Sequence, residues 1–272
     1  MTDEKAEEKA AKLLVNAHRP RGLTAIGKAV KLLVDAHRSR TLAAIGNIAL
    51  TSEQDAYRVQ DSVFAKLWPG AKPAAWKAGG PSDKLEPNAA PIAPEKLLTS
   101  PASVAAASMN MLGVEAEIAF RLSRDLPPRA RPYSERSVAA AVGEVLVAIE
   151  LCDTRLAGWK ESSGLWKLAD FQTNGALVAG SGTADWQKID FPNQEVEFTI
   201  GARVVKAKGS HSFGNPFRLM PWIANHCARR GMGLRAGNVV TTGAWTGLEI
   251  AHAGDEVVAR FPGIGEARVR IT

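Results

Sequence analysis

The chain has 272 residues, of which 46% are apolar and 23% charged, and its formal net charge is +6. This length allows one large domain, or one domain with a small helical unit, and the composition excludes a mainly disordered chain. The 34 basic residues are spread along the chain instead of gathered in one block, so we expect no nucleic-acid-binding surface.

Hydropathy and cysteine content bear on the cellular setting. No apolar run approaches the roughly 20 residues that cross a bilayer, so no membrane association is expected. Residues 1–5 (MTDEK) are charged and lack the apolar core of a signal peptide. Two cysteines, Cys152 and Cys227, are too few for a disulfide framework or a zinc site, and buried free thiols are expected. Together these features predict a cytoplasmic protein.

The N-terminal region contains an internal duplication. Residues 9–19 (KAAKLLVNAHR) recur as residues 28–38 (KAVKLLVDAHR), and each copy has apolar residues at helical spacing. Two copies are too few for a solenoid, so the pattern predicts a tandem duplication of one amphipathic helix. The repeated His18 and His37 are expected to be surface or packing residues because of this helical context.

Helical patterns give way to strand patterns after residue 73. A third helix, capped by Thr51 or Ser52, is predicted over about residues 53–67. Most of the later chain has strand-like alternation, and residues 196–207 are predicted to form a hairpin. This order favours an α+β fold over a doubly wound sheet. We expect a helical N-terminal portion and a catalytic mixed-sheet domain, over residues 1–73 and 74–272.

The sharpest chemical pattern is a pair of acids in residues 113–120 (GVEAEIAF). Side chains two residues apart share a face of a strand, so Glu115 and Glu117 are predicted to point the same way. Neighbouring carboxylates without a counterion repel each other. A hard divalent cation would remove that repulsion, and oxygen ligands suit Mg²⁺ or Mn²⁺.

A third acid, Glu150, interrupts the apolar run of residues 145–152 (VLVAIELC). A buried unpaired carboxylate is costly, so Glu150 needs a partner. An ion pair with Arg155 or Lys160 would suffice for Glu150 alone. Taken with the acid pair of the earlier strand, Glu150 favours a metal site formed by three carboxylates.

Several ordered motifs resemble the fumarylacetoacetate hydrolase superfamily, most closely its 2-keto-4-pentenoate hydratase and 4-oxalocrotonate decarboxylase branch. Residues 113–120 and 149–155 (IELCDTR) are similar to the metal-binding strands of these hydratases. The similarity covers about residues 28–272 and is strongest from residue 112 onward. It also includes residues 76–79 (WKAG), 169–175 (ADFQTNG) and 234–248 (LRAGNVVTTGAWTGL).

The resemblance implies a mixed β-sandwich or roll with a helical N-terminal portion, usually in a homo-oligomer. It implies that the three acids Glu115, Glu117 and Glu150 bind Mg²⁺ or Mn²⁺. It places Lys77 in the substrate pocket, where it would form a hydrogen bond or assist proton transfer. Substrate contacts are implied for four further residues, which are Asn174, Thr242, Gly243 and Thr246.

The activity that the resemblance implies is hydration of a 2-hydroxy-2,4-dienoate, a small anionic 2-keto/2-hydroxy acid from aromatic-ring cleavage. The metal would act as a Lewis acid and stabilise the enolate. Decarboxylation of a 4-oxalocrotonate-type acid has nearly the same site requirements, and a second cationic contact would favour it. Hydrolysis of an acylpyruvate needs a His–Glu pair, and the available histidines, His211, His226 and His252, lack its spacing.

Two residues depart from the family pattern. Ala244 stands where many relatives carry Ser or Thr, which removes one possible hydroxyl contact with the substrate. Asn88 aligns with a position where hydratases often have Asp, which weakens the case for an acid–base pair with Lys77. A non-catalytic subunit of a hydratase–decarboxylase complex therefore stays open, although three retained acids argue for activity.

Overall fold

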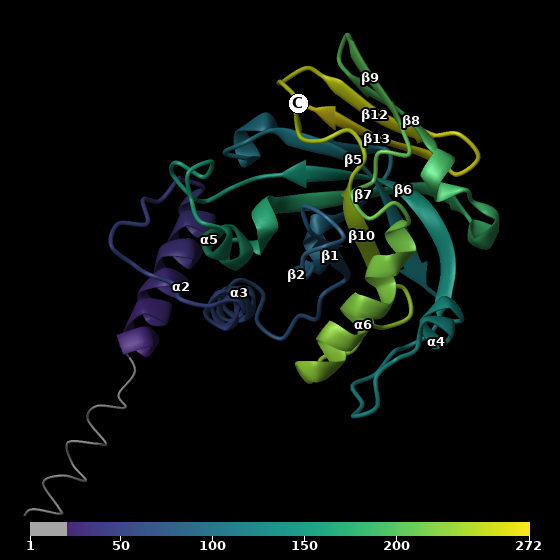
Figure 1. Cartoon of the computed structure of the whole chain (residues 1–272). Coiled ribbons are helices and arrows are strands. Elements are labelled where there is room, and N and C mark those ends of the chain that lie inside the picture. Colours follow the sequence, from purple (N-terminus) through teal and green to yellow (C-terminus); the bar gives the residue numbers. More distant parts are fainter. Residues whose placement is uncertain (1–20) are drawn as a thin grey trace, which may run out of the picture.

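The structure is a computed structural model that describes residues 21–272 (Figure 1). The first copy of the duplicated motif lies outside the described residues, and the second copy falls within helix α2. The predicted third helix is confirmed, because the Ser52 side chain accepts a hydrogen bond from the Asp55 amide at its start. The helices are α2 (Arg21–Ser39), α3 (Glu53–Leu67), α4 (Glu135–Ala139), α5 (Gly164–Ala169) and α6 (Leu219–Arg229).

A mixed sheet with the strand order β2-β1-β10-β5-β6-β7-β3 forms the centre of the molecule, and β11 pairs with β5. A single 3-10 turn, η1 (Pro94–Lys96), joins the edge strands β2 and β3, so the sheet curls into a roll. In sheet order, the strands are β2 (Asn88–Ile92), β1 (Ala75–Gly79), β10 (Val239–Ala244), β5 (Gly113–Leu122), β6 (Val142–Cys152), β7 (Asn174–Thr183), β3 (Leu97–Thr99) and β11 (Glu249–Ile250).

A second sheet, with the order β4-β13-β12-β8-β9, packs on the outer face of the roll (Figure 1). The predicted hairpin is confirmed as β8 and β9. Phe120 of the roll and Phe198 of the second sheet belong to one apolar core, in which each fully buried side chain contributes about 1.5–3 kcal/mol. The strands are β4 (Ala102–Val104), β13 (Gly265–Ile271), β12 (Glu256–Phe261), β8 (Glu195–Ile200) and β9 (Arg203–Lys208).

Strand alternation gives the roll two different faces. On β5, Val114 and Ile118 join the core shared with the second sheet, while Glu115 and Glu117 point to the interior. The interior also holds a separate apolar cluster on the same strand faces. Its buried members are Ala75, Ile92, Ala119, Leu146, Ala148, Leu177, Ala179 and Val239.

Helices α2, α3 and α5 form a third apolar cluster beside the edge strand β2. The buried Gln60 amide of α3 donates to the carbonyl oxygens of Ala89 and Leu168, so it ties α3 to β2 and α5. The predicted α+β class is confirmed by these helices and two sheets, while the division at residue 73 stays a prediction. Among residues 21–272, no helix is both long and apolar enough to cross a membrane.

Candidate functional site

The three acids meet inside the roll. Glu115 and Glu150 are direct partners across β5 and β6, and their ligand oxygens lie within 4.8 Å of each other. Glu117 follows on the same face of β5 but lies outside this closest group. Glu117 and Glu150 are fully buried, and the Glu115 side chain is 16% exposed. The structure therefore gathers the predicted acids, with Glu115 nearest to solvent.

Lys77 reaches these acids from β1. Its Nζ lies 2.9 Å from Oε1 and 2.8 Å from Oε2 of Glu150, although only Oε1 lies in a hydrogen-bonding direction. The same Nζ lies 3.8 Å from Glu115. Lys77 is therefore the ion-pair partner of Glu150. The sequence alone had left Arg155 and Lys160 open as partners.

Burial and charge act in opposite directions on this cluster. Burial disfavours the Lys77 ammonium, but Glu150 and Glu115 outweigh it and hold the pKa of Lys77 well above its usual range. Burial, followed by repulsion from Glu150, raises the pKa of Glu117. Burial also raises the pKa of Glu115, against the attraction of Lys77. One ammonium cannot balance three carboxylates, so the cluster retains an excess of negative charge or a proton.

Glu117 and Glu150 are held by dedicated donors. Oε2 of Glu117 accepts hydrogen bonds from the Thr241 hydroxyl and from the Gly243 amide, the latter at 2.8 Å. Oε1 of Glu150 accepts one from the Asn174 amide at 2.9 Å. Oε1 of Glu117 is buried and has no hydrogen-bond partner in the described part of the chain. An oriented carboxylate with one orphaned oxygen is what a metal ligand requires, so these residues fit a divalent cation.

The other predicted substrate residues fall in two places. Asn174 and Gly243 contact the acids directly, as described above. The Thr242 hydroxyl instead donates to the Ile118 carbonyl at 2.6 Å, on the opposite face of β10. The Thr246 hydroxyl is buried and without a partner in the described structure. The substrate roles of Thr242 and Thr246 stay predictions.

The resemblance placed Thr241 at the start of a loop that lines the pocket, but the sequence did not predict its hydrogen bond to Glu117 or the position of Cys152 beside the acids. Thr241 alternates with Thr242 along β10 and faces Glu117, as the period of two would have indicated. Cys152 follows Glu150 by two residues on β6, and its sulfur lies within 4.8 Å of the ligand oxygens of the acid pair across β5 and β6. The prediction that both cysteines are buried free thiols is confirmed.

The histidines lie in other surroundings. Nε2 of His211 donates to the Thr242 carbonyl at 2.8 Å, and His226 stacks on Trp222. His252 is 77% exposed and pairs with Asp255 at the surface. None of these recorded partners is a member of the acid cluster, which argues against a His–Glu pair for acylpyruvate hydrolysis.

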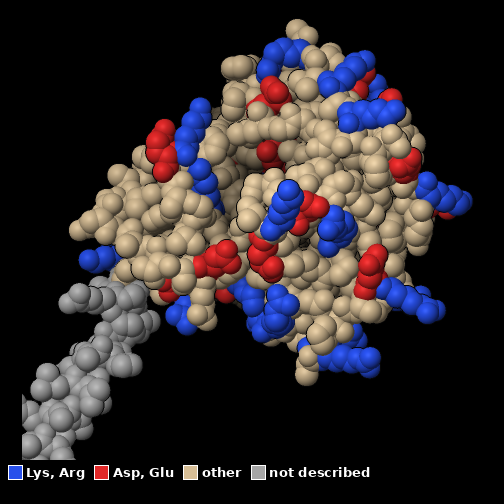
Figure 2. Space-filling model, viewed as in Figure 1, with Lys and Arg blue, Asp and Glu red and all other residues tan. Residues whose placement is uncertain are grey.

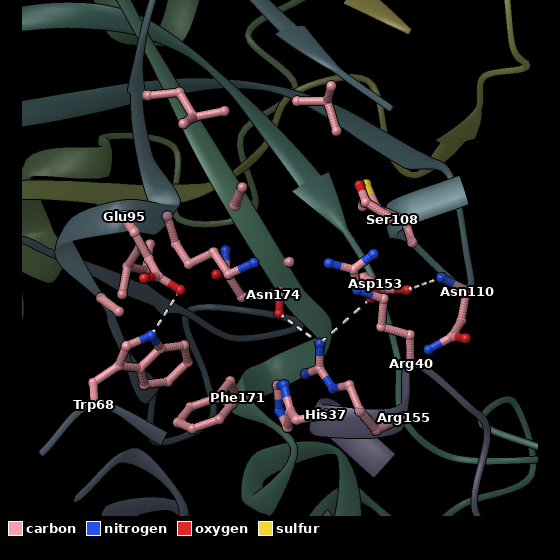
Figure 3. Close-up of a pocket in the computed structure, with 18 of the residues that line it drawn as sticks. His37, Arg40, Trp68, Glu95, Ser108, Asn110, Asp153, Arg155, Phe171 and Asn174 are labelled. Atoms are coloured by element: carbon pink, nitrogen blue, oxygen red, sulfur yellow. Dashed lines mark hydrogen bonds and ion pairs between the residues drawn. The ribbon is translucent and has the colours of Figure 1, made fainter. Parts of the chain in front are cut away.

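A cavity of about 170 Å³ adjoins the cluster at Asn174 (Figure 3). Arg155 at its wall is buried, binds Asp170 at 2.5 Å and donates to the Asn174 carbonyl at 3.0 Å. His37 packs edge-on against Phe171 there, as expected of a packing residue. The Arg155 charge is already paired, so Arg155 is not a free cation for a second substrate carboxylate.

The departures Asn88 and Ala244 both lie close to the predicted site residues. Asn88 pairs with Gly79 at the end of β1, and its Oδ1 is buried with no partner in the described part of the chain. Ala244 is the strand partner of Glu117.

Figure 2 shows acidic atoms at the floor of a hollow, while basic and acidic groups intermingle over the rest of this face.

Comparison with known proteins places these features in a family context. The model of the family described as "Fumarylacetoacetate (FAA) hydrolase C-terminal" matches residues 31–272. The 2-keto-4-pentenoate hydratases of Paraburkholderia phymatum and Burkholderia vietnamiensis are each 30% identical to this chain, over 163 and 167 residues. These alignments cover 60% and 61% of this chain and 61% and 63% of the relatives, so the match spans about three fifths of the length of these relatives.

Solved structures with the same fold include 4-oxalocrotonate decarboxylase from Pseudomonas putida G7. Its structure complexed with magnesium and adipate has a TM-score of 0.80 and 21% identity, and the match covers 92% of this chain and 97% of that one. A structure complexed with calcium and acetate also has a TM-score of 0.80. At this identity the likeness shows the fold alone, and it confirms the predicted sandwich or roll.

Proposed function

Because this chain belongs to the fumarylacetoacetate hydrolase family, we propose that it is a metal-dependent hydratase of 2-hydroxy-2,4-dienoates of the 2-keto-4-pentenoate type. The observation that carries the proposal is the buried cluster of three carboxylates and one lysine inside the roll. Relatives at 30% identity that are named 2-keto-4-pentenoate hydratase support this choice of substrate class.

Glu115, Glu117 and Glu150 would hold Mg²⁺ or Mn²⁺. The orphaned Oε1 of Glu117 and the unbalanced negative charge support this set of ligands. When bound, the cation would supply positive charge to the carboxylate and 2-oxygen of the substrate as negative charge develops there. The Thr241 hydroxyl and the Gly243 amide keep Glu117 oriented, and the Asn174 amide does so for Glu150.

Lys77 would act as the proton donor. Its pKa is held high by Glu150 and Glu115, so Nζ keeps its proton in the free enzyme. An arriving substrate would bring a carboxylate and a dienol carbon next to this ammonium. Nζ would then pass a proton to the distal carbon of the dienol while the 2-hydroxyl group loses its proton to solvent. This gives an α,β-unsaturated 2-keto acid, to which water adds.

The pocket around the cluster would supply polar contacts. Oδ1 of Asn88 and the hydroxyl of Thr246 are buried and lack partners among the described residues, so a substrate or a water molecule would satisfy them. Asn174 and Gly243 complete the proposed lining of the site. A substrate contact of Thr242 would come from its backbone, because its hydroxyl is bound to the Ile118 carbonyl. We also propose a homo-oligomer, which light scattering of the purified protein would test.

Decarboxylation of a 4-oxalocrotonate-type acid is the second candidate. The fold shared with 4-oxalocrotonate decarboxylase over 92% of this chain favours it. A substrate with two carboxylates needs a second cationic contact, and the buried Arg155 is already paired with Asp170. Arg40 and Lys96 also line the cavity beside Asn174, so this contact does not separate the two candidates. Hydration ranks first because the relatives at 30% identity are named 2-keto-4-pentenoate hydratase.

Product analysis tests both candidates. The protein with Mg²⁺ or Mn²⁺ would receive 2-hydroxypenta-2,4-dienoate and, separately, 4-oxalocrotonate, with a chelator control and mass spectrometry of each mixture. Metal-dependent gain of one water by the first substrate would support the hydratase. Loss of CO₂ from the second without hydration of the first would move the assignment to the decarboxylase. Turnover of neither would contradict the proposal, and acylpyruvates would be tested next.

A further inference from the structure

Cys152 occupies the interior of the roll beside the acids. It follows Glu150 by two residues on β6, so its side chain lies on the same face of the strand. Its sulfur and one ligand oxygen each of Glu115 and Glu150 all lie within 4.8 Å of one another. Among residues 21–272, these are the three acid, histidine or cysteine side chains whose ligand atoms lie close enough together to hold one metal ion.

The neighbouring strands make room for this sulfur. Gly113 is the partner of Cys152 across β5 and β6. A Cβ at Gly113 would lie 2.9 Å from Cβ of Cys152 and 2.7 Å from Leu248, so any larger residue would press on the cysteine. On its other side Cys152 pairs with Asn174, whose amide holds Glu150. The backbone therefore fixes Cys152 and Glu150 relative to each other.

We propose that Cys152 supplies a sulfur ligand to the metal site, so that the site also takes a thiophilic divalent cation such as Cd²⁺ or Zn²⁺ through Glu115, Glu150 and Cys152. This inference rests on the proposed metal site. Carboxylate oxygens suit hard cations, whereas a thiolate favours soft ones. Sulfur and oxygen ligands on one tetrahedral Zn²⁺ lie roughly 3.6 Å apart. The three ligand atoms all lie within 4.8 Å of one another, so small side-chain adjustments would bring them to this separation.

Binding of the cation would displace the Lys77 ammonium from Glu150 and release the thiol proton of Cys152. The Lys77 ammonium, 2.8 Å from Glu150, is the group that an incoming cation displaces from the carboxylate. The metal–sulfur bond forms as the S–H bond breaks, and the proton passes to the buffer. No electron is transferred, so no oxidant or reductant is needed.

The second buried cysteine offers a matched control. Cys227 is fully buried in α6, within the apolar core of the two sheets. Cys152→Ala and Cys227→Ala therefore make the same chemical change at two buried free thiols, one beside the acids and one away from them. Cys152→Ser serves as a second variant, because it keeps a small polar side chain if the alanine variant fails to fold.

The test is metal binding to the metal-free full-length protein. Cd²⁺ and Mn²⁺ are titrated separately by calorimetry, and ultraviolet difference spectra record the sulfur-to-cadmium charge-transfer band. We expect wild type and Cys227→Ala to show the band with one equivalent of Cd²⁺. We expect Cys152→Ala and Cys152→Ser to lose the band and at least about 10-fold in Cd²⁺ affinity, while Mn²⁺ affinity changes less than about threefold.

The outcomes separate the two proposals. Tight Mn²⁺ binding without a cadmium band in wild type would overturn the sulfur ligand and leave the carboxylate site standing. A band that persists in both Cys152 variants and is lost in Cys227→Ala would also overturn it. Failure of wild type to bind either cation would overturn the metal site of the proposed function, and the sulfur ligand with it.

Discussion

Nζ of Lys77 lies 2.8 Å from Glu150, although their strands β1 and β6 are separated in the sheet by β10 and β5. The ion pair therefore crosses the interior of the roll and joins opposite walls. It places a positive charge where a divalent cation would bind, so the lysine and the metal compete for the same carboxylate.

Replacing Lys77 should separate chemistry from metal binding. Lys77→Met removes the competing ammonium, so we expect the Kd for Mn²⁺ to stay constant or to fall. Turnover should drop by about 10²–10⁴-fold, because the proton donor is lost. Calorimetry and a hydration assay would measure the two effects. Weaker Mn²⁺ binding, or turnover at the wild-type rate, would contradict the role given to Lys77.

The neighbouring threonines of β10 give a matched pair. Thr241→Val removes the hydroxyl that orients Glu117, and we expect a loss of about 10–100-fold in Mn²⁺ affinity or activity. Thr242→Val removes a hydroxyl bound to the Ile118 carbonyl, so it should lower stability with little change in metal affinity. Equal metal affinities for the two variants would show that Thr241 does not position Glu117.

The buried pair of Arg155 and Asp170 should contribute to stability. Arg155→Met leaves the Asp170 carboxylate buried without its partner, which should lower the free energy of unfolding by about 3–5 kcal/mol. The partly exposed pair of Arg121 and Glu144 is the control, and Arg121→Met should cost less than about 1 kcal/mol. Urea unfolding of both variants measures the difference, and similar losses would refute the distinction.

Two histidines, the buried His226 and the largely buried His37, should make the fold sensitive to acid. Burial lowers the pKa of His37 to about 2 and that of His226 to about 4, from an ordinary value of about 6.5. Asp170 lies 4.0 Å from His37, but it is paired with Arg155 and does not reverse the shift. Below pH 6.5 the unfolded chain binds protons that the folded chain excludes. The free energy of unfolding therefore decreases as the pH is lowered.

This loss ends near pH 4 for His226 and near pH 2 for His37. At pH 5 it should amount to about 2 kcal/mol for each histidine, at 1.36 kcal/mol per pH unit. Urea unfolding between pH 7.5 and 5 should show the decline, and His37→Phe should reduce it. His252→Gln, at an exposed position, is the control. A decline unchanged in His37→Phe would rule out His37 as a source.

Much of the site could be predicted because it depends on local order in the sequence. The period of two along a strand places Glu115 and Glu117 on one face, and it holds in the structure. Glu150 was recognisable because an acid inside an apolar run needs a partner. The Ser52 cap and the hairpin of β8 and β9 are likewise read from short segments.

The remaining features depend on long-range closure of the sheet. Lys77 and Glu150 are 73 residues apart, and only the curl of the roll brings them together. The alternation that separates Thr241 from Thr242 becomes informative once β10 is known to adjoin β5. Cys152 carried a visible pattern, since it follows Glu150 by two residues, but its apolar neighbours favoured a purely structural interpretation.

The apolar cluster that includes Ala75, Leu146 and Val239 fills one end of the roll, and the acids lie toward the other end. The interior is therefore apolar at the end that this cluster fills and polar at the end that holds the acids. In the proposed hydratase, substrate would reach the acids from the side on which Glu115 is partly exposed, and product would leave by the same side. Accumulated product should then compete with substrate for the acids and slow turnover.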